Sequence, residues 1–289
     1  MDLLEQTKQL CKMYEIKPAR SKGQNFLIDE ESYDAIIRAA DLKKDDTVLE
    51  VGPGLGFLTA ILAKIVKRVV SVELDDKLAG LLQIALDSQG VENVEVVNQD
   101  VMKFEISDLF PLAKGEIKRG YKIVANLPYN ITSQFLRKFL SEVEIKPESI
   151  VLMLQKEVVE RITAGPGEMS LLAVSVQFYA EAELVEVVKA ENFWPAPKID
   201  SAIVRLKLKE KIPLTPLIKG AVDEKDFFRL VKFGFSARRK MLKNNLAGGL
   251  HMKQGEIEEK IKKIGLDPKI RAQDLSMEDW MGLYKEFYQ

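Results

Sequence analysis

Five short β-rich runs alternate with helical stretches between Thr47 and Gln155, and this alternation limits the possible folds more than any other feature. The β-rich runs cover residues 47–51, 69–73, 94–98, 122–125 and 149–155, and the helical stretches cover residues 57–66, 77–86 and 133–140. Strands that alternate with helices predict a parallel sheet with helices on both faces.

The pattern changes in the last third of the chain. Two runs, 183–189 and 202–209, are separated by a proline-containing loop and predict a hairpin that closes the sheet. The segment 211–216 contains two prolines, which donate no backbone hydrogen bond, and predicts a linker. Helical patterns follow over residues 224–245, 256–264 and 277–287. We therefore predict an α/β domain with a mostly parallel sheet over residues 1–210 and a small all-helical domain over residues 211–289.

A single cysteine, Cys11, and a single histidine, His251, exclude much chemistry. An internal disulfide cannot form, and a zinc site built from cysteine and histidine cannot be assembled. His251 follows two glycines and is predicted to be a solvated loop residue, so we expect neither a metal nor a histidine base. The first residues lack the layout of a signal peptide and no apolar run could span a bilayer, which predicts a cytoplasmic chain without a membrane partner. We expect it to act as a monomer.

The strand ending at Val51 runs into a turn that contains Gly52, Gly54 and Gly56 and then into a helix. Glycines let the backbone turn tightly and let a ligand approach the main chain closely. A dinucleotide site favours the spacing G-x-G-x-x-G, whereas Phe57 occupies the last position of that pattern here. The spacing therefore argues against NAD as the ligand.

Two acidic residues mark the ends of the next two strands. Glu73 lies about 20 residues beyond the glycines, where a carboxylate can accept hydrogen bonds from both ribose hydroxyls. Asp100 follows the third strand, where a carboxylate could accept a hydrogen bond from an adenine amine. The turn and the two acids predict a pocket for a nucleoside without a pyrophosphate site.

The loop after the fourth strand reads Asn126-Leu127-Pro128-Tyr129. Because ligands bind beyond the carboxyl ends of parallel strands, this loop is expected to face the same crevice as the glycine turn. The adenine N6 amine is a poor nucleophile, since its lone pair is delocalised into the ring. Asn126 and a backbone carbonyl of the Pro128 turn could accept its two hydrogens, and Tyr129 could stack on the base.

The chain resembles the KsgA (RsmA) family of ribosomal RNA adenine dimethyltransferases over nearly its whole length. The motifs that carry the resemblance are Gly23-Gln24-Asn25-Phe26-Leu27, Glu50-Val51-Gly52-Pro53-Gly54, Asn126-Leu127-Pro128-Tyr129-Asn130, Met153-Leu154-Gln155-Lys156-Glu157-Val158, Phe193-Trp194-Pro195-Ala196-Pro197-Lys198-Ile199-Asp200-Ser201 and Arg238-Arg239-Lys240. Their occurrence together and in this order is highly specific.

The resemblance implies a class I, Rossmann-like methyltransferase sheet with a helical C-terminal domain. It implies N6 dimethylation of two adjacent adenosines near the 3′ end of small-subunit (16S) ribosomal RNA within immature 30S particles. It implies that S-adenosylmethionine is held by Asn25, Leu27, Gly52, Gly54, Glu73, Asp100 and Asn126. It also implies that Phe193 packs against the target adenine opposite Tyr129, although an aromatic residue before a proline-rich loop is as often a core anchor.

The chain departs from the family pattern at Glu168-Met169-Ser170, where the family typically has a tyrosine-glycine pair before its next helix. This loop is expected on the RNA-facing side. The departure therefore affects its contacts with the RNA substrate. The residues predicted for the chemistry are unaffected.

Basic residues near the C-terminal domain predict how RNA is held. On a helical wheel, cationic residues between Phe227 and Lys243 gather within an arc of roughly 100°, and apolar residues occupy the other side. The cations of this stripe, which contains no acid, are Arg229, Lys232, Arg239, Lys240 and Lys243. We predict that they bind phosphates.

Three alternatives remain at this point. A close relative could methylate large-subunit RNA instead, although the segment at 238–240 and Phe193-Trp194-Pro195 fit the small-subunit type better. A second possibility is a ribosome-assembly or RNA-binding factor whose methylation is secondary or lost. A third is an NAD-dependent oxidoreductase, which Phe57 disfavours.

Overall fold

The computed structural model describes residues 2–18, 24–109, 120–128, 131–209 and 223–289. These residues form two compact units. The first, here called the sheet unit, comprises Met1–Val159 and Ala182–Leu208, and the second, the helical unit, comprises Glu160–Glu181 and Lys209–Gln289. The predicted boundary after residue 210 and the predicted linker at 211–216 lie outside the described residues, so that boundary stays a prediction.

A seven-stranded sheet with the strand order β4-β3-β2-β5-β6-β9-β7 forms the core of the sheet unit. Its strands are β2 (Thr47–Val51), β3 (Arg68–Glu73), β4 (Val94–Asn98), β5 (Lys122–Asn126), β6 (Ser149–Gln155), β7 (Ala180–Val188) and β9 (Ser201–Leu208). The strands from β4 to β6 pair in parallel, and β9 joins β6 antiparallel. The predicted mostly parallel sheet is confirmed, and the two runs predicted to close it, β7 and β9, are hydrogen-bonded neighbours.

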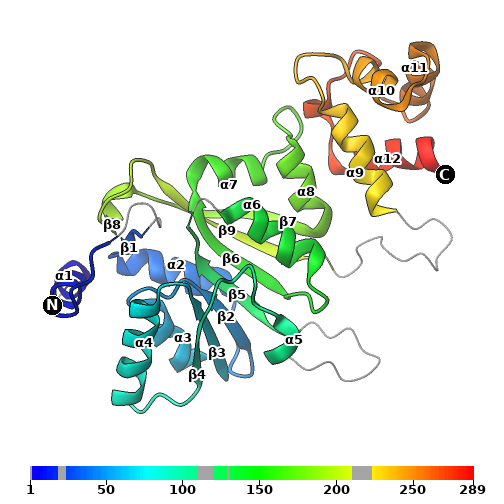
Figure 1. Ribbon diagram of the computed structural model, residues 1–289. Coiled ribbons are helices and arrows are strands. Elements are labelled where there is room, and N and C mark those ends of the chain that lie inside the picture. Colours follow the sequence, from blue (N-terminus) through cyan, green and yellow to red (C-terminus); the bar gives the residue numbers. More distant parts are fainter. Residues whose placement is uncertain (1, 19–23, 110–119, 129–130, 210–222) are drawn as a thin grey trace. The chain divides into compact units, whose positions relative to one another are not determined.

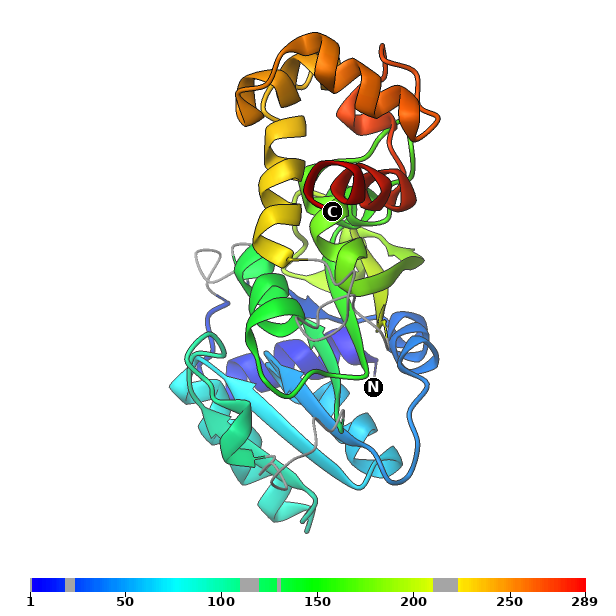
Figure 2. The same ribbon diagram turned by 90° about the vertical axis from the view of Figure 1, so that its right-hand side faces the viewer.

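Helices cover both faces of this sheet, and Figures 1 and 2 show α2 and α6 on opposite sides of it. The helices of the sheet unit are α1 (Leu3–Met13), α2 (Glu30–Ala40), α3 (Phe57–Ile65), α4 (Asp76–Ser88), α5 (Ile106–Leu109) and α6 (Thr132–Arg137), and the boundary of the unit falls within α7 (Lys156–Ile162). The chain continues from α6 directly into a π-helical turn, Lys138–Glu142. The middle strands β2, β5 and β6 are buried almost throughout, as expected for strands covered on both faces.

A second, two-stranded sheet was not predicted from the sequence. β1 (Phe26–Leu27) pairs antiparallel with β8 (Phe193–Trp194), so Leu27 lies opposite Phe193 and Phe26 opposite Trp194. The buried hydroxyl of Tyr33 donates a hydrogen bond of 3.1 Å to the Leu27 carbonyl. This small sheet joins two segments that are distant in the chain.

The helical unit is built from α8 (Leu171–Tyr179), α9 (Glu224–Gly234), α10 (Leu242–Leu250), α11 (Gln254–Lys263) and α12 (Met277–Tyr288), with a short 3-10 turn at Ala272–Asp274. Its core contains the fully buried Phe227 and Trp280. In Figure 2, α9 (yellow) and α12 (red) lie side by side, and the two helices are in contact.

The prediction of one helix over residues 224–245 is wrong, because α9 ends at Gly234 and α10 begins only at Leu242. A Cβ atom on Gly234 would lie 2.3 Å from the Trp280 ring, so this residue packs without a side chain against α12. The Asn245 side chain donates hydrogen bonds to the carbonyls of Gly234, at 2.6 Å, and Ala237, at 3.1 Å. These bonds satisfy carbonyls where α9 stops, and they stabilise the turn between the helices.

The segment that departs from the family pattern lies in the helical unit. Met169 is buried, and its N–H donates to the Gln273 carbonyl at 3.1 Å, as the N–H of Gly167 does at 2.9 Å. The Ser170 side chain caps α8 by accepting from the N–H of Ala173 at 3.1 Å. The departing residues therefore anchor the start of α8 within this unit.

None of the helices in the described parts of the chain combines the length and the apolar character needed to cross a membrane.

Candidate active site

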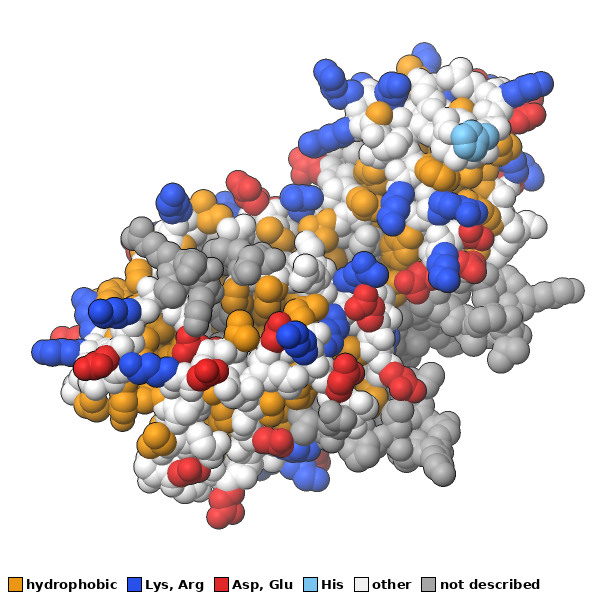
Figure 3. Space-filling model, in the orientation of Figure 1, with side chains coloured by type: hydrophobic (Ala, Val, Ile, Leu, Met, Phe, Trp, Pro, Cys, Tyr) orange, Lys and Arg blue, Asp and Glu red, His pale blue; other side chains and the backbone are white. Residues whose placement is uncertain are grey.

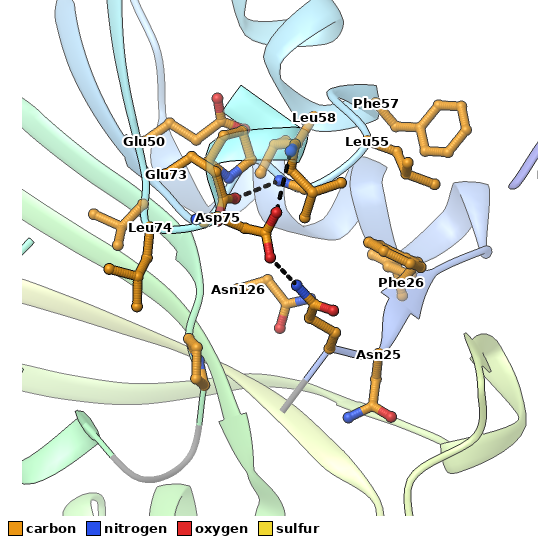
Figure 4. Close-up of a pocket in the computed structure, with 18 of the residues that line it drawn as sticks. Asn25, Phe26, Glu50, Leu55, Phe57, Leu58, Glu73, Leu74, Asp75 and Asn126 are labelled. Atoms are coloured by element: carbon orange, nitrogen blue, oxygen red, sulfur yellow. Dashed lines mark hydrogen bonds between the residues drawn. The ribbon is translucent and has the colours of Figure 1, made fainter. Parts of the chain in front are cut away.

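A cavity opens beyond the carboxyl ends of β2, β3 and β5, at the edge where the sequence predicted a nucleoside pocket (Figure 4). The residues that line it come from the segment before α2, the glycine turn and the tips of the three strands. They are Gln24, Asn25, Phe26, Leu27, Tyr33, Ile36, Glu50, Val51, Gly52, Pro53, Gly54, Leu55, Phe57, Leu58, Glu73, Leu74, Asp75, Leu78, Asn126 and Pro128.

The glycine turn brings bare backbone to the wall of this cavity. Gly52 and Gly54 have φ values of +69° and +58°, in the left-handed region that favours glycine. A Cβ atom on Gly52 would lie 3.5 Å from the Asn126 carbonyl oxygen, and one on Gly54 would lie 3.3 Å from the Phe26 ring. Side chains at these positions would occupy the space beside the turn, so the glycines form a cradle that admits a ligand to the main chain.

The Glu73 carboxylate at the tip of β3 is held in place from both sides. It accepts hydrogen bonds from the N–H of Gly54 at 3.2 Å and from the N–H of Asp75 at 2.9 Å. Glu73 is only 7% exposed, and this burial raises the pKa of its carboxyl, against the effect of the backbone amides of Asp75, Gly54 and Leu74. Each carboxylate oxygen keeps a second lone pair for a ligand hydroxyl, as the predicted ribose contact requires.

A second buried carboxyl, Glu50, was quoted as part of a motif but was given no role by the sequence. Its Oε2 atom accepts from the hydroxyls of Thr59 and Ser71, both at 2.7 Å. Its Oε1 atom is buried and has no hydrogen-bond partner among the described residues. Burial raises the pKa of Glu50 to about 7, although the two hydroxyl bonds act to lower it. This orphaned oxygen is an acceptor available to a ligand that brings its own donor.

Asn126 ends β5 and lines the cavity beside the glycine turn, as predicted. Among the described residues its side chain has no hydrogen-bond partner. The next residue, Leu127, is buried and donates its N–H to the Met153 carbonyl at 3.3 Å. Pro128 lines the cavity, and its carbonyl accepts from the N–H of Ile131 at 3.3 Å. Backbone hydrogen bonds therefore fix the turn, and no described residue occupies the Asn126 amide. Tyr129 lies outside the described residues.

The structure does not bring every predicted residue to the cavity. Asn25, Leu27, Gly52, Gly54, Glu73 and Asn126 line it, whereas Asp100 and Phe193 are not among its lining residues. Asp100 is connected to the site through Gln99, whose N–H donates to the Glu73 carbonyl at 3.0 Å. Phe193 is only 3% exposed and packs in a core cluster with Tyr33. Its environment is that of a core anchor, and its contact with a target base stays a prediction.

Two residues of the cavity wall were missed although the sequence carried a signal for each. The Phe26 ring faces the glycine turn and lies between Asn25 and Leu27, which were both predicted. Asp75 follows Glu73 by two residues and caps α4, and its other oxygen is 3.5 Å from the Gln24 amide. A short polar residue just before a helix is a common N-cap, which places Asp75 near the strand tip.

The predicted basic stripe is not one face of a continuous helix, since Arg239 and Lys240 lie between α9 and α10. Arg229 pairs with Asp226 at 2.8 Å and Lys243 pairs with Glu258 at 2.8 Å, so acids neutralise these two cations. Lys232, Arg239 and Lys240 are exposed and form no ion pair within the described ranges. Figure 3 shows lysine and arginine side chains gathered on the visible face of the helical unit.

Within the described ranges, no group of three or more His, Cys, Asp or Glu side chains is arranged to hold a metal ion. His251 is exposed and caps the end of α10 in a left-handed conformation, which confirms the prediction of a solvated histidine.

The cavity combines a glycine cradle, the buried acceptor Glu73 and the orphaned oxygen of Glu50, and these features fit a nucleoside-type ligand. A cavity of this kind at the edge of such a sheet defines a Rossmann-like methyltransferase that uses S-adenosylmethionine. The model of the family described as ribosomal RNA adenine dimethylase matches residues 16–289. The chain belongs to this family, and the predicted activity, dimethylation of adenines in ribosomal RNA, is confirmed at the level of the family.

Named relatives agree with this assignment. The chain is 44% identical to Ribosomal RNA small subunit methyltransferase A of Dehalococcoides mccartyi (strain CBDB1), over 99% of this chain and 94% of the relative. It is 39% identical to the protein of that name from Clostridioides difficile (strain 630), over 95% and 92%. Among solved structures it is similar to a dimethyladenosine transferase from Plasmodium falciparum, with a TM-score of 0.75 and 26% identity over 91% of this chain and 97% of that one. It is also similar to the 23S rRNA methyltransferase ErmE, with a TM-score of 0.72 and 30% identity over 92% and 100%.

Proposed function

We propose that the chain dimethylates the N6 amines of two adjacent adenosines near the 3′ end of 16S ribosomal RNA, in immature 30S particles. The observation that carries the proposal is the Asn126 amide, which lines the cavity with Gly52 and Glu73 and has no hydrogen-bond partner among the described residues. The two relatives named for small-subunit methylation support the choice of RNA.

In this proposal the sheet unit binds the methyl donor by its nucleoside and by its amino-acid tail. Glu73 accepts from the two ribose hydroxyls, and Asp100 accepts from the adenine amine. The backbone at Gly52 and Gly54 lets the tail lie against the turn, with Asn25 and Leu27 on the other wall. The orphaned Oε1 of Glu50 accepts from a donor on the ligand. The bound donor supplies an electrophilic methyl group on a sulfonium.

The target adenine is held by the turn after β5. The Asn126 side-chain oxygen accepts one N6 hydrogen. The second hydrogen goes to a backbone carbonyl of the turn, Leu127 or Pro128, of which Pro128 also accepts from the N–H of Ile131. Two acceptors favour a pyramidal nitrogen, whose lone pair then points at the methyl group. Tyr129 and Phe193 are proposed to stack on the base, which an adenine taken out of its helix requires.

Methyl transfer leaves one proton too many on the amine nitrogen. After the methyl transfer the nitrogen carries a positive charge, and loss of its proton restores a neutral amine. In this proposal the site positions and polarises the amine, and the proton passes to solvent.

The helical unit is proposed to bind the RNA backbone. Lys232, Arg239 and Lys240 are the exposed cations of the predicted set, and they are joined by the neighbouring Arg238. Arg229 and Lys243 are proposed to contribute less to RNA binding, because each would have to break an ion pair with an acidic side chain. Phosphate contacts of this kind add affinity without reading sequence.

Labelled S-adenosylmethionine and 30S particles that lack the modification test the proposal. We expect label in two adjacent adenosines near the 3′ end of 16S RNA, identified as dimethyladenosine by mass spectrometry of RNA fragments. Label in any other nucleotide, or none, contradicts the assignment.

The likeness to ErmE supports a second candidate, methylation of large-subunit RNA. Deproteinised 23S RNA, added to the same assay, separates the two. Label in 23S RNA alone favours the second candidate, and label in 16S RNA alone favours the first.

A further inference from the structure

Lys138 is a buried cation of the sheet unit that the proposed chemistry does not use. Only 7% of its surface is exposed. Its Nζ atom donates hydrogen bonds to the carbonyls of Val101 at 3.0 Å, Met102 at 3.0 Å and Phe104 at 2.6 Å. An ammonium group has three N–H donors, and here each of them meets a carbonyl of one short turn.

Among the described residues, carbonyl dipoles rather than an ion pair stabilise the charge of Lys138. No carboxylate among the described residues lies within ion-pair distance of Nζ. Burial lowers the pKa of Lys138, while the more distant Glu105 and Asp100 act in the opposite direction. Burying a charged lysine costs free energy, so a buried lysine is normally ion-paired or fully hydrogen-bonded. Lys138 is fully hydrogen-bonded.

The turn to which Lys138 donates its hydrogen bonds begins at Asp100. The N–H of Met102 donates to Asp100 Oδ1 at 2.9 Å, and the N–H of Lys103 donates to the Asp100 carbonyl at 2.9 Å. Met102 thus links the two side chains: its carbonyl accepts from Lys138, and its N–H donates to the Asp100 carboxylate. No described residue occupies the second carboxylate oxygen of Asp100.

Lys138 also begins the π-helical turn that continues α6, and α6 follows the Asn126 turn in the chain. Phe135 and Phe139 are fully buried with ring centroids 4.5 Å apart, which anchors this helix in the core. π-helical turns are rare and concentrate at functional sites. The grip of Lys138 therefore joins a rigid helix to the turn after β4.

We propose that Lys138 is a positioning residue that fixes Asp100 for recognition of the adenine amine of the methyl donor. The inference rests on the proposed function, in which Asp100 accepts from that amine. Without the ammonium, three carbonyls each lose a hydrogen bond, although Val101 keeps the one from the N–H of Phe104. The turn at 100–104 then loosens, and Asp100 no longer selects an amine over an oxygen.

Selectivity between S-adenosylhomocysteine and S-inosylhomocysteine tests this role, because inosine carries an oxygen where adenosine carries the N6 amine. Both affinities are measured by calorimetry on the full chain. We expect the wild-type chain to prefer the adenosine compound by about tenfold or more, since a site built to pair a polar group rejects a ligand that lacks it. Lys138→Met is expected to reduce this ratio to about twofold, and Lys138→Gln, which keeps two N–H donors, to fall between.

Lys122→Met is the matched control. Lys122 is also a buried lysine of the sheet unit, and its Nζ contacts Asp46 at 2.8 Å and the Asp41 carbonyl at 2.6 Å. It begins β5, at the end of the strand opposite Asn126. This variant is expected to lose stability and to keep the wild-type ratio.

The outcomes separate the inference from the function on which it rests. If Asp100→Asn keeps the wild-type ratio of the two affinities, the proposed role of Asp100 fails, and the inference fails with it. If Asp100→Asn loses the preference while both Lys138 variants keep it, the inference alone is overturned. An equal loss in Lys122→Met also overturns it, because general destabilisation then explains the effect. If Lys138→Met does not fold, Lys138→Gln decides.

Discussion

The backbone N–H of Gly54 donates a 3.2 Å hydrogen bond to the carboxylate of Glu73, so the glycine turn after β2 and the tip of β3 hold each other in place. Through this bond the acceptor proposed for the ribose also fixes the loop proposed for the amino-acid tail. A change at Glu73 therefore affects two parts of the donor site at once.

Replacing Glu73 by Gln is expected to weaken S-adenosylhomocysteine binding by about 10-fold to 100-fold, since hydrogen bonds to a charged group contribute roughly 1.5–3 kcal/mol. The amide keeps one acceptor oxygen but replaces the other with a donor. Calorimetry measures the affinity, and the exposed Glu92→Gln is the control, expected to bind as the wild type does. Unchanged affinity in Glu73→Gln would refute the ribose contact.

Asn126→Ala is expected to lower the rate of methyl transfer at saturating donor by a factor of about 10²–10³, the range seen when one preorganised hydrogen-bonding group is removed from an active site. The fold is expected to persist, because the Asn126 side chain supports no other described residue. Methyl incorporation into 30S particles gives the rate, and urea unfolding reports the fold. Normal turnover in this variant would exclude the proposed mechanism.

Glu50 is expected to make stability depend on pH. Between its ordinary pKa of 4.5 and about 7, the folded chain holds a proton that the unfolded chain has released, so the free energy of unfolding falls as the pH rises through this window. The total change is on the order of 3 kcal/mol, and the raised pKa of Glu73 adds to it in the same direction.

Urea unfolding from pH 4.5 to 8 measures this change in the wild type and in Glu50→Gln. The variant is expected to lose most of the slope, whereas the exposed Glu92→Gln keeps it. A slope that Glu50→Gln leaves intact would assign the pH dependence to other groups.

Arg239→Ala combined with Lys240→Ala is expected to weaken binding to 30S particles and to make it less sensitive to salt. Each phosphate contact contributes about 0.7–0.9 to the slope of log affinity against log salt, so the double variant should flatten it by about 1–2. Filter binding over a series of salt concentrations measures both effects.

The double variant Arg229→Ala with Lys243→Ala removes the same charge from the two ion-paired positions. Because each of these cations already has an acidic partner, its effect on the slope is expected to be smaller. Equal effects would mean that the ion pairs do not limit RNA binding.

Residues at the tips of parallel strands were predictable, because every such strand ends at the same edge. Gly52, Glu73 and Asn126 were placed together from their positions after β-rich runs alone. The pairing of Phe26 with Trp194 was not predictable in this way. A ladder of two residues has no periodicity of its own, and its partners are distant in the chain.

The same reason explains the error in the helical unit. The apolar and basic pattern continues through Gly234, so the sequence favours one long helix there. The break depends on the Trp280 ring and on the Asn245 amide, which both come from other elements. Lys138 was overlooked for a related reason. Its hydrogen-bond partners are backbone carbonyls, and the amino-acid sequence does not indicate which carbonyls lie near a lysine.

The ladder between β1 and β8 also sets the order in which the donor site can be completed during synthesis. Phe26 and Leu27 line the cavity, yet their strand partners are Phe193 and Trp194, which the ribosome adds long after the glycine turn and the Asn126 turn. A nascent chain that ends before Phe193 therefore has the strand tips of the pocket but no partner for this wall. Once Trp194 has emerged the wall can close, while the C-terminal helices of the helical unit are still being made.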